Sequence, residues 1–453
     1  PAGDAERLQG ILAGLQAADR TPDLWPGFKA SAFPLVLVDA ERVAYLLHHP
    51  RPTAPFAPAA GLSGVALTHA LDGLPRGLAF GVPLGDREGV VIPMTPLDDQ
   101  NTLTAYHELF HAYQDQKAFY HGHSTDMSPR DAQDLGRAEA EHALLAAALQ
   151  AATPEGRQAA CRQFLALRAL RQAGAGEDFV ANEDGLEALE GTARYVEARV
   201  QIAAAGAPGV PASPAFMPEA ALRQALVSEL EAPLDPDTFR RRRYMLTGAA
   251  MGFLLDALAP GWKGEVEAGK RLVERLTEAT GYRQQDAEAL LAAAEEAVGI
   301  RARIEAAVDR MAAVEIERAA ALAAFEQSPG RRVEVRVPAE YGGFGLSTYE
   351  QHAIADHVEL FGPDTTLSLE HADLSLTLEG RLLLRELPAG YAFEFHAREA
   401  SWLLDGGATP GAGTAEGALV LSAEGVTLRA TRARVTVAGD RTIVELPPYS
   451  AVE

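Results

Sequence analysis

The spacing of apolar residues predicts a chain that is helical over most of its length. Apolar positions recur every three or four residues in long stretches, which is the period of an amphipathic helix. Helices are predicted over residues 4–18, 102–114, 131–152, 154–172, 182–197, 244–256, 266–278, 284–298 and 300–326. Short apolar runs predict buried strands at 33–38, 41–47, 77–84 and 89–94, the last two forming a hairpin. The N-terminal part therefore combines a small sheet with helices.

The period changes from 3.6 residues to two after the break at Ser328-Pro329-Gly330. Strand-like runs then recur at 332–337, 366–370, 372–378, 381–386, 391–395, 418–422, 425–430, 433–438 and 441–446. Regularly spaced short strands are typical of a small β-sandwich or barrel. The sequence thus predicts an α+β protein with three parts: an N-terminal α/β part with an edge hairpin (1–100), a helical core (101–328) and an all-β C-terminal domain (331–453).

Composition and charge narrow the possible partners. The 453 residues are 47% hydrophobic, and 40 basic against 63 acidic residues give a net charge of −23, which argues against nucleic acid as a partner. No apolar run reaches the roughly 18–20 residues of a membrane span. The one basic block, Arg240–Arg243, is interpreted as the solvated start of a helix. Cys161 stands alone, which excludes a disulfide within the chain, and we expect it to be buried.

His107, Glu108 and His111 form the strongest chemical signal in the chain. Residues four apart share one face of a helix, so the two imidazoles can bind a single cation. Glu108 projects beside them, where it can take a proton from a metal-bound water whose pKa zinc has lowered. The apolar residues of the same helix group on its other side. The pattern predicts a zinc site with hydrolytic chemistry.

A catalytic zinc site usually has three protein ligands, so two histidines leave it incomplete. No third histidine follows at short spacing. An acidic helix downstream, Asn182–Glu197, carries three carboxylates that can turn toward the metal, those of Glu183, Glu187 and Glu190. Spacing alone does not choose among them.

The segment Glu190–Tyr195 (EGTARY) resembles the Glu-Gly-Phe-Ala-x-Tyr segment of zinc aminopeptidases, a branch of the gluzincins, the thermolysin-like superfamily of HExxH zinc metallopeptidases. The resemblance implies that Glu190 is the third zinc ligand. Glu187, one turn earlier, then suits the orientation of a ligand histidine. The substrate-anchoring Gly-x-Met-Glu-Asn strand of that branch is absent from this sequence.

A second stretch, Tyr244–Asp256, is similar to the gluzincin helix that begins with a tyrosine and a glycine and continues into apolar residues. In that branch the tyrosine hydroxyl helps to stabilise the oxyanion on the scissile carbonyl. Gly248 follows Tyr244 by four residues where the family usually shows three, and one residue rotates a helical side chain by about 100°. Tyr244 is therefore the first candidate for this role and Tyr195 the second.

These observations predict a zinc-dependent metallopeptidase that binds one zinc ion per chain and hydrolyses peptide or protein substrates. Its ligands are His107, His111 and Glu190, and Glu108 is the general base. One alternative is an envelope-associated or binding protein on the same scaffold, with structural zinc or no activity. Another is a helix whose histidines bind no metal.

The sequence begins at Pro1 without a methionine, which favours a bacterial protein of the periplasm or the extracellular space over a cytoplasmic one. The C-terminal β domain is then a candidate for contact with a cell-envelope partner. An exposed β-edge before the helix at 102–114 suits the binding of an extended peptide, although a purely structural hairpin explains it equally well.

Overall fold

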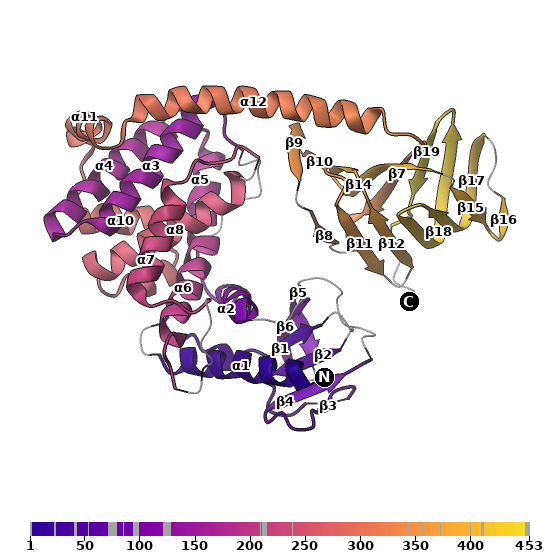
Figure 1. Cartoon of the computed structure of the whole chain (residues 1–453), viewed down its shortest axis with the longest axis horizontal. Coiled ribbons are helices and arrows are strands. Elements are labelled where there is room, and N and C mark those ends of the chain that lie inside the picture. The colour runs from indigo at the N-terminus through magenta and orange to yellow at the C-terminus, as the bar shows by residue number, and fades with distance from the viewer. Residues whose placement is uncertain are drawn as a thin grey trace. The chain divides into compact units, whose positions relative to one another are not determined.

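The fold is that of a computed structural model, which combines a helical region with a C-terminal all-β region in an α+β arrangement (Figure 1). The residues that the structure describes are 2–21, 24–39, 43–52, 54–70, 79–84, 86–93, 99–120, 128–208, 210, 215–237, 239–341, 344–348, 350–355, 357–371, 373–398, 400–408 and 412–448. The chain divides into two compact units, Pro1–Met311 and Ala312–Glu453. Their boundary lies within one long helix, whereas the sequence predicts it near residue 328.

The N-terminal unit contains a six-stranded sheet. Its strands are β1 (Leu35–Val38), β2 (Ala44–Leu47), β3 (Ala57–Pro58), β4 (Val65–Thr68), β5 (Ala79–Leu84) and β6 (Arg87–Pro93). Their order is β3-β4-β2-β1-β6-β5, with β1 parallel to β6 and the other neighbours antiparallel. Leu35 and Leu37 join the main core, while Val36 belongs to a separate cluster on the other face. The predicted edge hairpin is therefore present, with β5 at the edge.

Helices form most of the rest of this unit, and the last of them continues across the boundary into the C-terminal unit (Figure 1). They are α1 (Ala2–Asp19), α2 (Asp99–Gln114), α3 (Ala132–Gln150), α4 (Pro154–Gln172), α5 (Glu177–Leu186), α6 (Thr192–Ala204), α7 (Glu219–Glu231), α8 (Phe239–Leu258), α9 (Trp262–Glu267), α10 (Leu272–Thr280), α11 (Ala287–Val298) and α12 (Ile300–Glu326). Short turns are η1 (Ala30–Ala32), the π-helical turn η2 (Glu187–Gly191) and η3 (Gln284–Asp286). One hydrophobic core joins residues of the helices to residues of the sheet, so residues 1–100 are not a separate body.

Local sequence signals explain where several of these helices begin and end. The Asp131 side chain accepts a hydrogen bond from the Asp134 N–H at 2.7 Å, which caps α3, and Thr153 caps α4 in the same way through Gly156. Helices α10 and α11 end at Gly281 and Gly299, whose positive φ angles favour glycine.

Two glycines allow α8 to approach the turn η2 closely. A Cβ built on Gly191 would lie 2.4 Å from the Gly248 Cα, and one built on Gly248 would lie 2.5 Å from the Glu187 carbonyl oxygen. Neither position has room for a side chain. The contact holds the backbone of η2, and thus of Glu190, against α8.

The C-terminal unit contains strands β7 to β19 in one hydrogen-bonded network. The strands are β7 (Arg331–Pro338), β8 (Gly345–Ser347), β9 (Gln351–Ala355), β10 (Val358–Phe361), β11 (Thr366–His371), β12 (Leu374–Glu379), β13 (Leu382–Leu387), β14 (Gly390–Ala397), β15 (Ser401–Leu404), β16 (Gly407–Ala408), β17 (Gly413–Ala423), β18 (Val426–Ala438) and β19 (Arg441–Glu445), with the turn η4 (Ala339–Tyr341) after β7. The main path is β16-β15-β17-β18-β19-β7-β14-β13-β10-β9, and β12 and β11 branch from β18. Buried residues of the main path and of the branch formed by β12 and β11 belong to one hydrophobic core.

Most of the predicted elements are present, with differences at particular places. The strands predicted at 425–430 and 433–438 form one strand, β18, which pairs with β17 along most of its length and with β12 and β19 along its two halves. Strand β3 has only two residues, and β8, β15 and β16 are also short. Such elements leave too few positions for a periodic signal.

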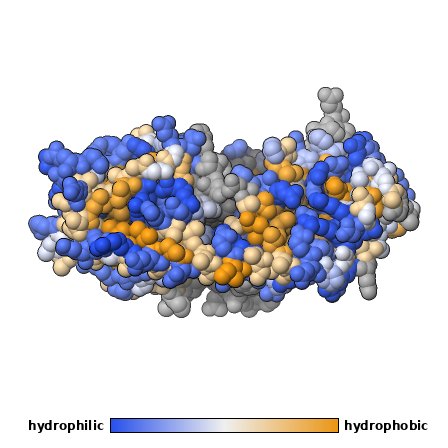
Figure 2. Space-filling view, turned by 90° about the horizontal axis from the view of Figure 1, so that it is seen from above, coloured by the Kyte–Doolittle hydropathy of each residue, from blue (hydrophilic) through white to orange (hydrophobic). Residues whose placement is uncertain are grey.

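Neither charge nor hydropathy marks a membrane segment in the described part of the chain. None of its helices combines the length and the apolar character that a membrane span requires. Figure 2 shows a face on which hydrophilic residues alternate with smaller hydrophobic patches.

We predict that Gly248→Ala destabilises the protein by about 1–3 kcal/mol, because the new methyl group overlaps the backbone of η2. Urea unfolding measures the effect. Gly264→Ala on α9 is the matched control, since a Cβ there meets no atom within 4 Å. An equal effect of both substitutions would contradict the close α8–η2 contact.

Candidate metal centre

Helix α2 and the turn η2 bring three potential metal ligands together. The Nε2 atoms of His107 and His111 lie 3.1 Å apart. The Oε2 atom of Glu190 is 3.3 Å from the first and 3.7 Å from the second. In the described part of the chain, these three residues form the group of histidine, cysteine and acidic side chains that is close enough to hold a metal ion. The structure thus gathers the three residues that the sequence predicts as ligands.

Hydrogen bonds on the far side of each imidazole fix its orientation. The Nδ1 atom of His111 lies 2.6 Å from the amide oxygen of Gln114, and Nδ1 of His107 lies 3.4 Å from a carboxylate oxygen of Glu197. Both partners accept hydrogen bonds, so each Nδ1 carries the proton. In its neutral form each ring then presents an Nε2 lone pair to the space shared with Glu190, as a metal ligand requires.

Gln114 also fixes the position of η2 relative to α2. Its side-chain amide donates hydrogen bonds to the Leu189 carbonyl at 2.9 Å and to the Thr192 hydroxyl at 2.8 Å. These two acceptors determine which end of the amide is nitrogen, and the oxygen therefore faces His111. A fully buried residue connects the two ligand-bearing segments.

The carboxylates around His107 change its acid–base properties. Burial alone would lower the pKa of His107, but its contacts with Glu190 and Glu197 outweigh burial and raise the pKa to about 9. Burial would raise the pKa of Glu197, but His107 and Arg194 together hold it below its ordinary value. This corner of the site therefore strongly favours a positive charge.

Glu108 lines a cavity of about 430 Å³ beside the ligands. The other residues that line the cavity are Thr104, His107, Arg194, Glu197, Glu229, Arg242, Met245 and Leu246. Only 7% of Glu108 is exposed. The carboxylate predicted as the base therefore belongs to a largely buried residue that lines this open cavity beside His107.

Glu183 and Glu187, the alternative ligands, belong to a buried cluster of charges instead. The Glu187 carboxylate accepts two hydrogen bonds from the Arg168 guanidinium, at 2.8 and 3.1 Å. Glu183 pairs with Arg171 and Arg243, and Glu141 lies between all three arginines. Glu187 therefore does not orient a ligand histidine; Glu197 has that position.

The basic block at the start of α8 is only partly a solvated helix start. Arg243 is completely buried in the cluster of charges, and Arg242 lines the cavity at Glu108. The side chains of Arg240 and Arg241 are not among those described. Successive helical residues point about 100° apart, which explains why neighbours face different surroundings. Cys161 is buried, as predicted.

Neither of the two candidate tyrosines is among the residues that line this cavity. The Tyr195 hydroxyl donates a hydrogen bond to Asp256 at 2.7 Å, and its ring packs against Trp262. Tyr244 is completely buried, with its ring 4.8 Å from the Arg243 guanidinium. Met245, three residues before Gly248, has the cavity-facing position instead. The extra residue between Tyr244 and Gly248 thus places Met245, and not Tyr244, at the cavity.

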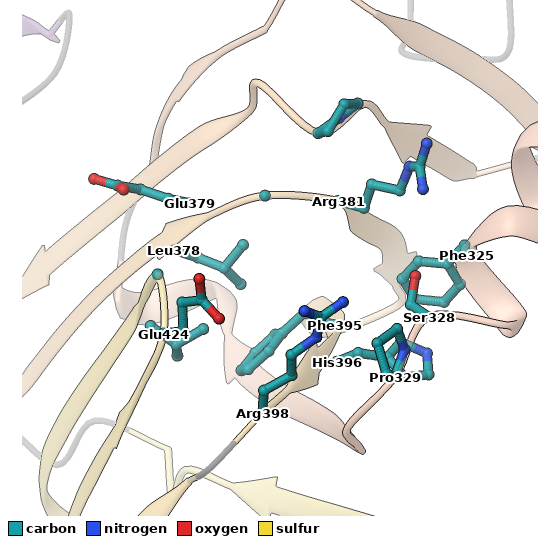
Figure 3. Close-up of a pocket in the computed structure, with 14 residues that line it drawn as sticks. Phe325, Ser328, Pro329, Leu378, Glu379, Arg381, Phe395, His396, Arg398 and Glu424 are labelled. Atoms are coloured by element: carbon teal, nitrogen blue, oxygen red, sulfur yellow. The ribbon is translucent and has the colours of Figure 1, made fainter.

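A second cavity, of about 500 Å³, lies in the C-terminal unit (Figure 3). Phe325 and Ser328, from the end of α12 and the turn after it, lie on one side, and Glu424 lies on the other. The charged residues that line it are Glu379, Arg381, Arg398 and Glu424, all exposed. This cavity contains no group of potential metal ligands among the described residues.

Comparisons with known proteins give no family for this chain. No protein-family model matches it, and no curated protein and no solved structure does so either. The resemblance to gluzincins, which was drawn from the short sequence motifs, therefore stays a prediction.

Glu197 and Gln114 are the functional residues that the sequence analysis missed. Each had a local signal. Glu197 follows Glu190 by seven residues, and Gln114 follows His107 by seven, a spacing that keeps two side chains on one helical face. The seven-residue spacing is a weak signal, because many residues on the exposed face of a helix have the same spacing.

We predict a pH-dependent contribution to stability from His142, which is completely buried between α3 and α8. Burial lowers its pKa well below the ordinary value, and Arg243 and Arg168 lower it further. The unfolded chain therefore binds a proton below pH 6.5 that the folded chain does not, and stability falls as the pH decreases. Between pH 7 and pH 5 the loss amounts to about 2 kcal/mol.

Urea unfolding of the wild type and of His142→Gln at pH 7 and pH 5 measures this contribution. The wild type should lose more stability than the variant over this interval. Equal losses in the two proteins would show that His142 is not the group responsible.

Proposed function

We propose that the protein is a zinc-dependent metallopeptidase with one zinc site per chain, formed by His107, His111 and Glu190. The observation that carries the proposal is the triangle of donor atoms from these residues, next to a cavity that Glu108 lines. Two histidines and a carboxylate are a known ligand set of catalytic zinc, with the fourth position left for water.

The dimensions of the triangle are compatible with a zinc ion. Its sides are 3.1, 3.3 and 3.7 Å. Bonds of about 2.0–2.1 Å in a tetrahedron give edges of about 3.3–3.4 Å between ligand atoms. The triangle therefore needs little rearrangement to take the ion. The hydrogen bonds of Gln114 and Glu197 to the far ring nitrogens are also typical of zinc-bound histidines.

The chain's own residues divide the chemistry among them. A zinc ion bound at the triangle would polarise the scissile carbonyl and lower the pKa of a water molecule. Glu108 removes a proton from the attacking water and returns it to the leaving amine. Glu197 and Gln114 keep the two imidazoles in the ligand tautomer. The proposal gives Tyr195 and Tyr244 no direct part, because neither lines the cavity.

The architecture is compatible with a gluzincin-like peptidase. We infer that the helices between 101 and 328 form its catalytic part, and that strand β5, at the edge of the N-terminal sheet, holds an extended substrate by main-chain hydrogen bonds. The C-terminal unit is, on this proposal, an accessory sandwich-like or barrel-like module.

We predict one zinc ion per purified chain, and its loss in His111→Ala and Glu190→Ala. Elemental mass spectrometry measures the metal content, and His357→Ala, an exposed histidine paired with Glu386, is the control that should keep zinc. Zinc retained at full occupancy by both ligand variants would contradict the site.

Glu108→Gln should keep the zinc ion and lower kcat by about 10²–10⁴-fold, because the general base is lost while the ligands remain. Hydrolysis of a peptide library by the variant and the wild type, followed by mass spectrometry, measures the effect. The proposed mechanism is wrong if the variant cleaves as fast as the wild type.

Glu197→Leu and Gln114→Leu should each weaken zinc binding by about 10–100-fold, because each removes the acceptor that orients a ligand imidazole. Competition with a zinc-binding dye measures the affinity. Glu274→Gln on α10, whose carboxylate pairs with Arg271, is the control. Unchanged affinity in both variants would show that the far-side hydrogen bonds do not matter.

A further inference from the structure

Arg242 presents a guanidinium group to the cavity at Glu108 without a hydrogen-bonded partner in the described chain. Its Nη2 atom lies 3.6 Å from the nearer carboxylate oxygen of Glu229, beyond hydrogen-bond length, and 65% of its side chain is exposed. It donates no hydrogen bond to any residue that the structure describes. A guanidinium has five N–H donors, and Arg242 lines the cavity together with His107 and Glu108.

Glu229 lies between two arginines but holds neither tightly. Arg194 approaches it at 3.8 Å and donates its hydrogen bond to Glu197 instead. Glu229 comes from α7, Arg194 from α6 and Arg242 from α8, so three helices meet at this wall of the cavity. Arg242 is thus a cation at the cavity wall whose ion pair with Glu229 is weak, so that an anionic ligand can replace Glu229.

Two neighbouring arginines of the basic block Arg240–Arg243, Arg242 and Arg243, have different surroundings. Arg243 is bound inside the buried cluster, where it donates to Glu141 at 3.1 Å. Arg242 has no such structural contact. The apolar side chains of Met245 and Leu246 lie along the same cavity. A charged group beside an apolar wall suits a ligand that has both an anionic end and a hydrophobic part.

We propose that Arg242 binds a carboxylate of the substrate, so that the site prefers peptides with a carboxylate close to the scissile bond. The planar guanidinium matches a carboxylate through two parallel N–H···O hydrogen bonds. The carboxylate is either the C-terminus of a short peptide or an acidic side chain. This inference rests on the proposed peptidase function and adds the class of substrate to it.

The experiment compares tripeptide libraries that differ in one charge, each prepared with free and with acetylated amino termini. One library has free C-terminal carboxylates and its partner is amidated; a second pair is amidated throughout and carries Glu or Gln at one position. Mass spectrometry gives kcat/KM for each library with the wild type, Arg242→Gln and Glu229→Gln. Arg283→Gln is the matched control, because Arg283 is 67% exposed, pairs with one acidic residue and does not line the cavity.

The wild type should cleave the carboxylate library about tenfold faster than its neutral partner, since a charged hydrogen-bonded pair has about that effect on binding. Arg242→Gln should reduce this ratio to about one, and Glu229→Gln should increase it by removing the competing carboxylate. Arg283→Gln should leave it unchanged. The library pair that shows the preference identifies the C-terminus or the side chain as the source. A ratio that is equal in the wild type and in Arg242→Gln overturns the proposal.

A binding measurement distinguishes failure of the peptidase proposal from failure of the proposed role of Arg242. Equilibrium dialysis of the same libraries against the Glu108→Gln protein reads binding without turnover. If no library is cleaved by the wild type, the peptidase function fails, while preferential retention of the carboxylate libraries still supports the role of Arg242. Equal retention of charged and neutral libraries contradicts it.

Discussion

The side-chain amide of Gln114 is the contact on which the candidate site depends most. It is completely buried and binds His111 through its oxygen and the backbone and side chain of the η2–α6 segment through its nitrogen. The same residue thus sets the tautomer of one ligand and the distance of another. The close contact of Gly191 with Gly248 helps to fix the same segment, because it holds η2 against α8.

The buried charges explain why η2 can carry Glu190 in a fixed place. Arg168 binds Glu187 at the start of the turn, and Arg171 and Arg243 bind Glu183 one turn before it. Taking so many charges out of water is costly, and breaking one buried pair typically costs about 3–5 kcal/mol. A cluster of this kind adds little net stability, but it strongly restricts the position of the backbone that it anchors.

Local patterns in the sequence were enough to predict the helix of His107 and His111 and most of the strands. The i, i+4 spacing places both imidazoles on one face whatever the rest of the fold does. The short segment at Glu190 gave a third candidate ligand through a resemblance, and the structure places the Glu190 carboxylate beside the two imidazoles.

Contacts between distant segments were beyond the reach of the sequence. Glu187 and Glu197 are both acidic residues on the same helical stretch, and only the packing of α4 shows that Arg168 takes the first. Whether Tyr244 reaches the cavity depends on a shift of one residue along the helix, because one residue turns a side chain by about 100°. Met245 lines the cavity instead. The pairing of β18 with β12, which is distant in the sequence, is likewise a long-range feature that no period can encode.

Anomalous diffraction at the zinc edge tests the central claim most directly. Crystals of the zinc-loaded protein should give one peak at about 2.0–2.2 Å from His107 Nε2, His111 Nε2 and Glu190 Oε2, with a fourth position free of protein ligands. Such a peak would establish the open three-ligand site on which the peptidase mechanism depends. The absence of a peak there, or a fourth protein ligand closing the site, would contradict the account.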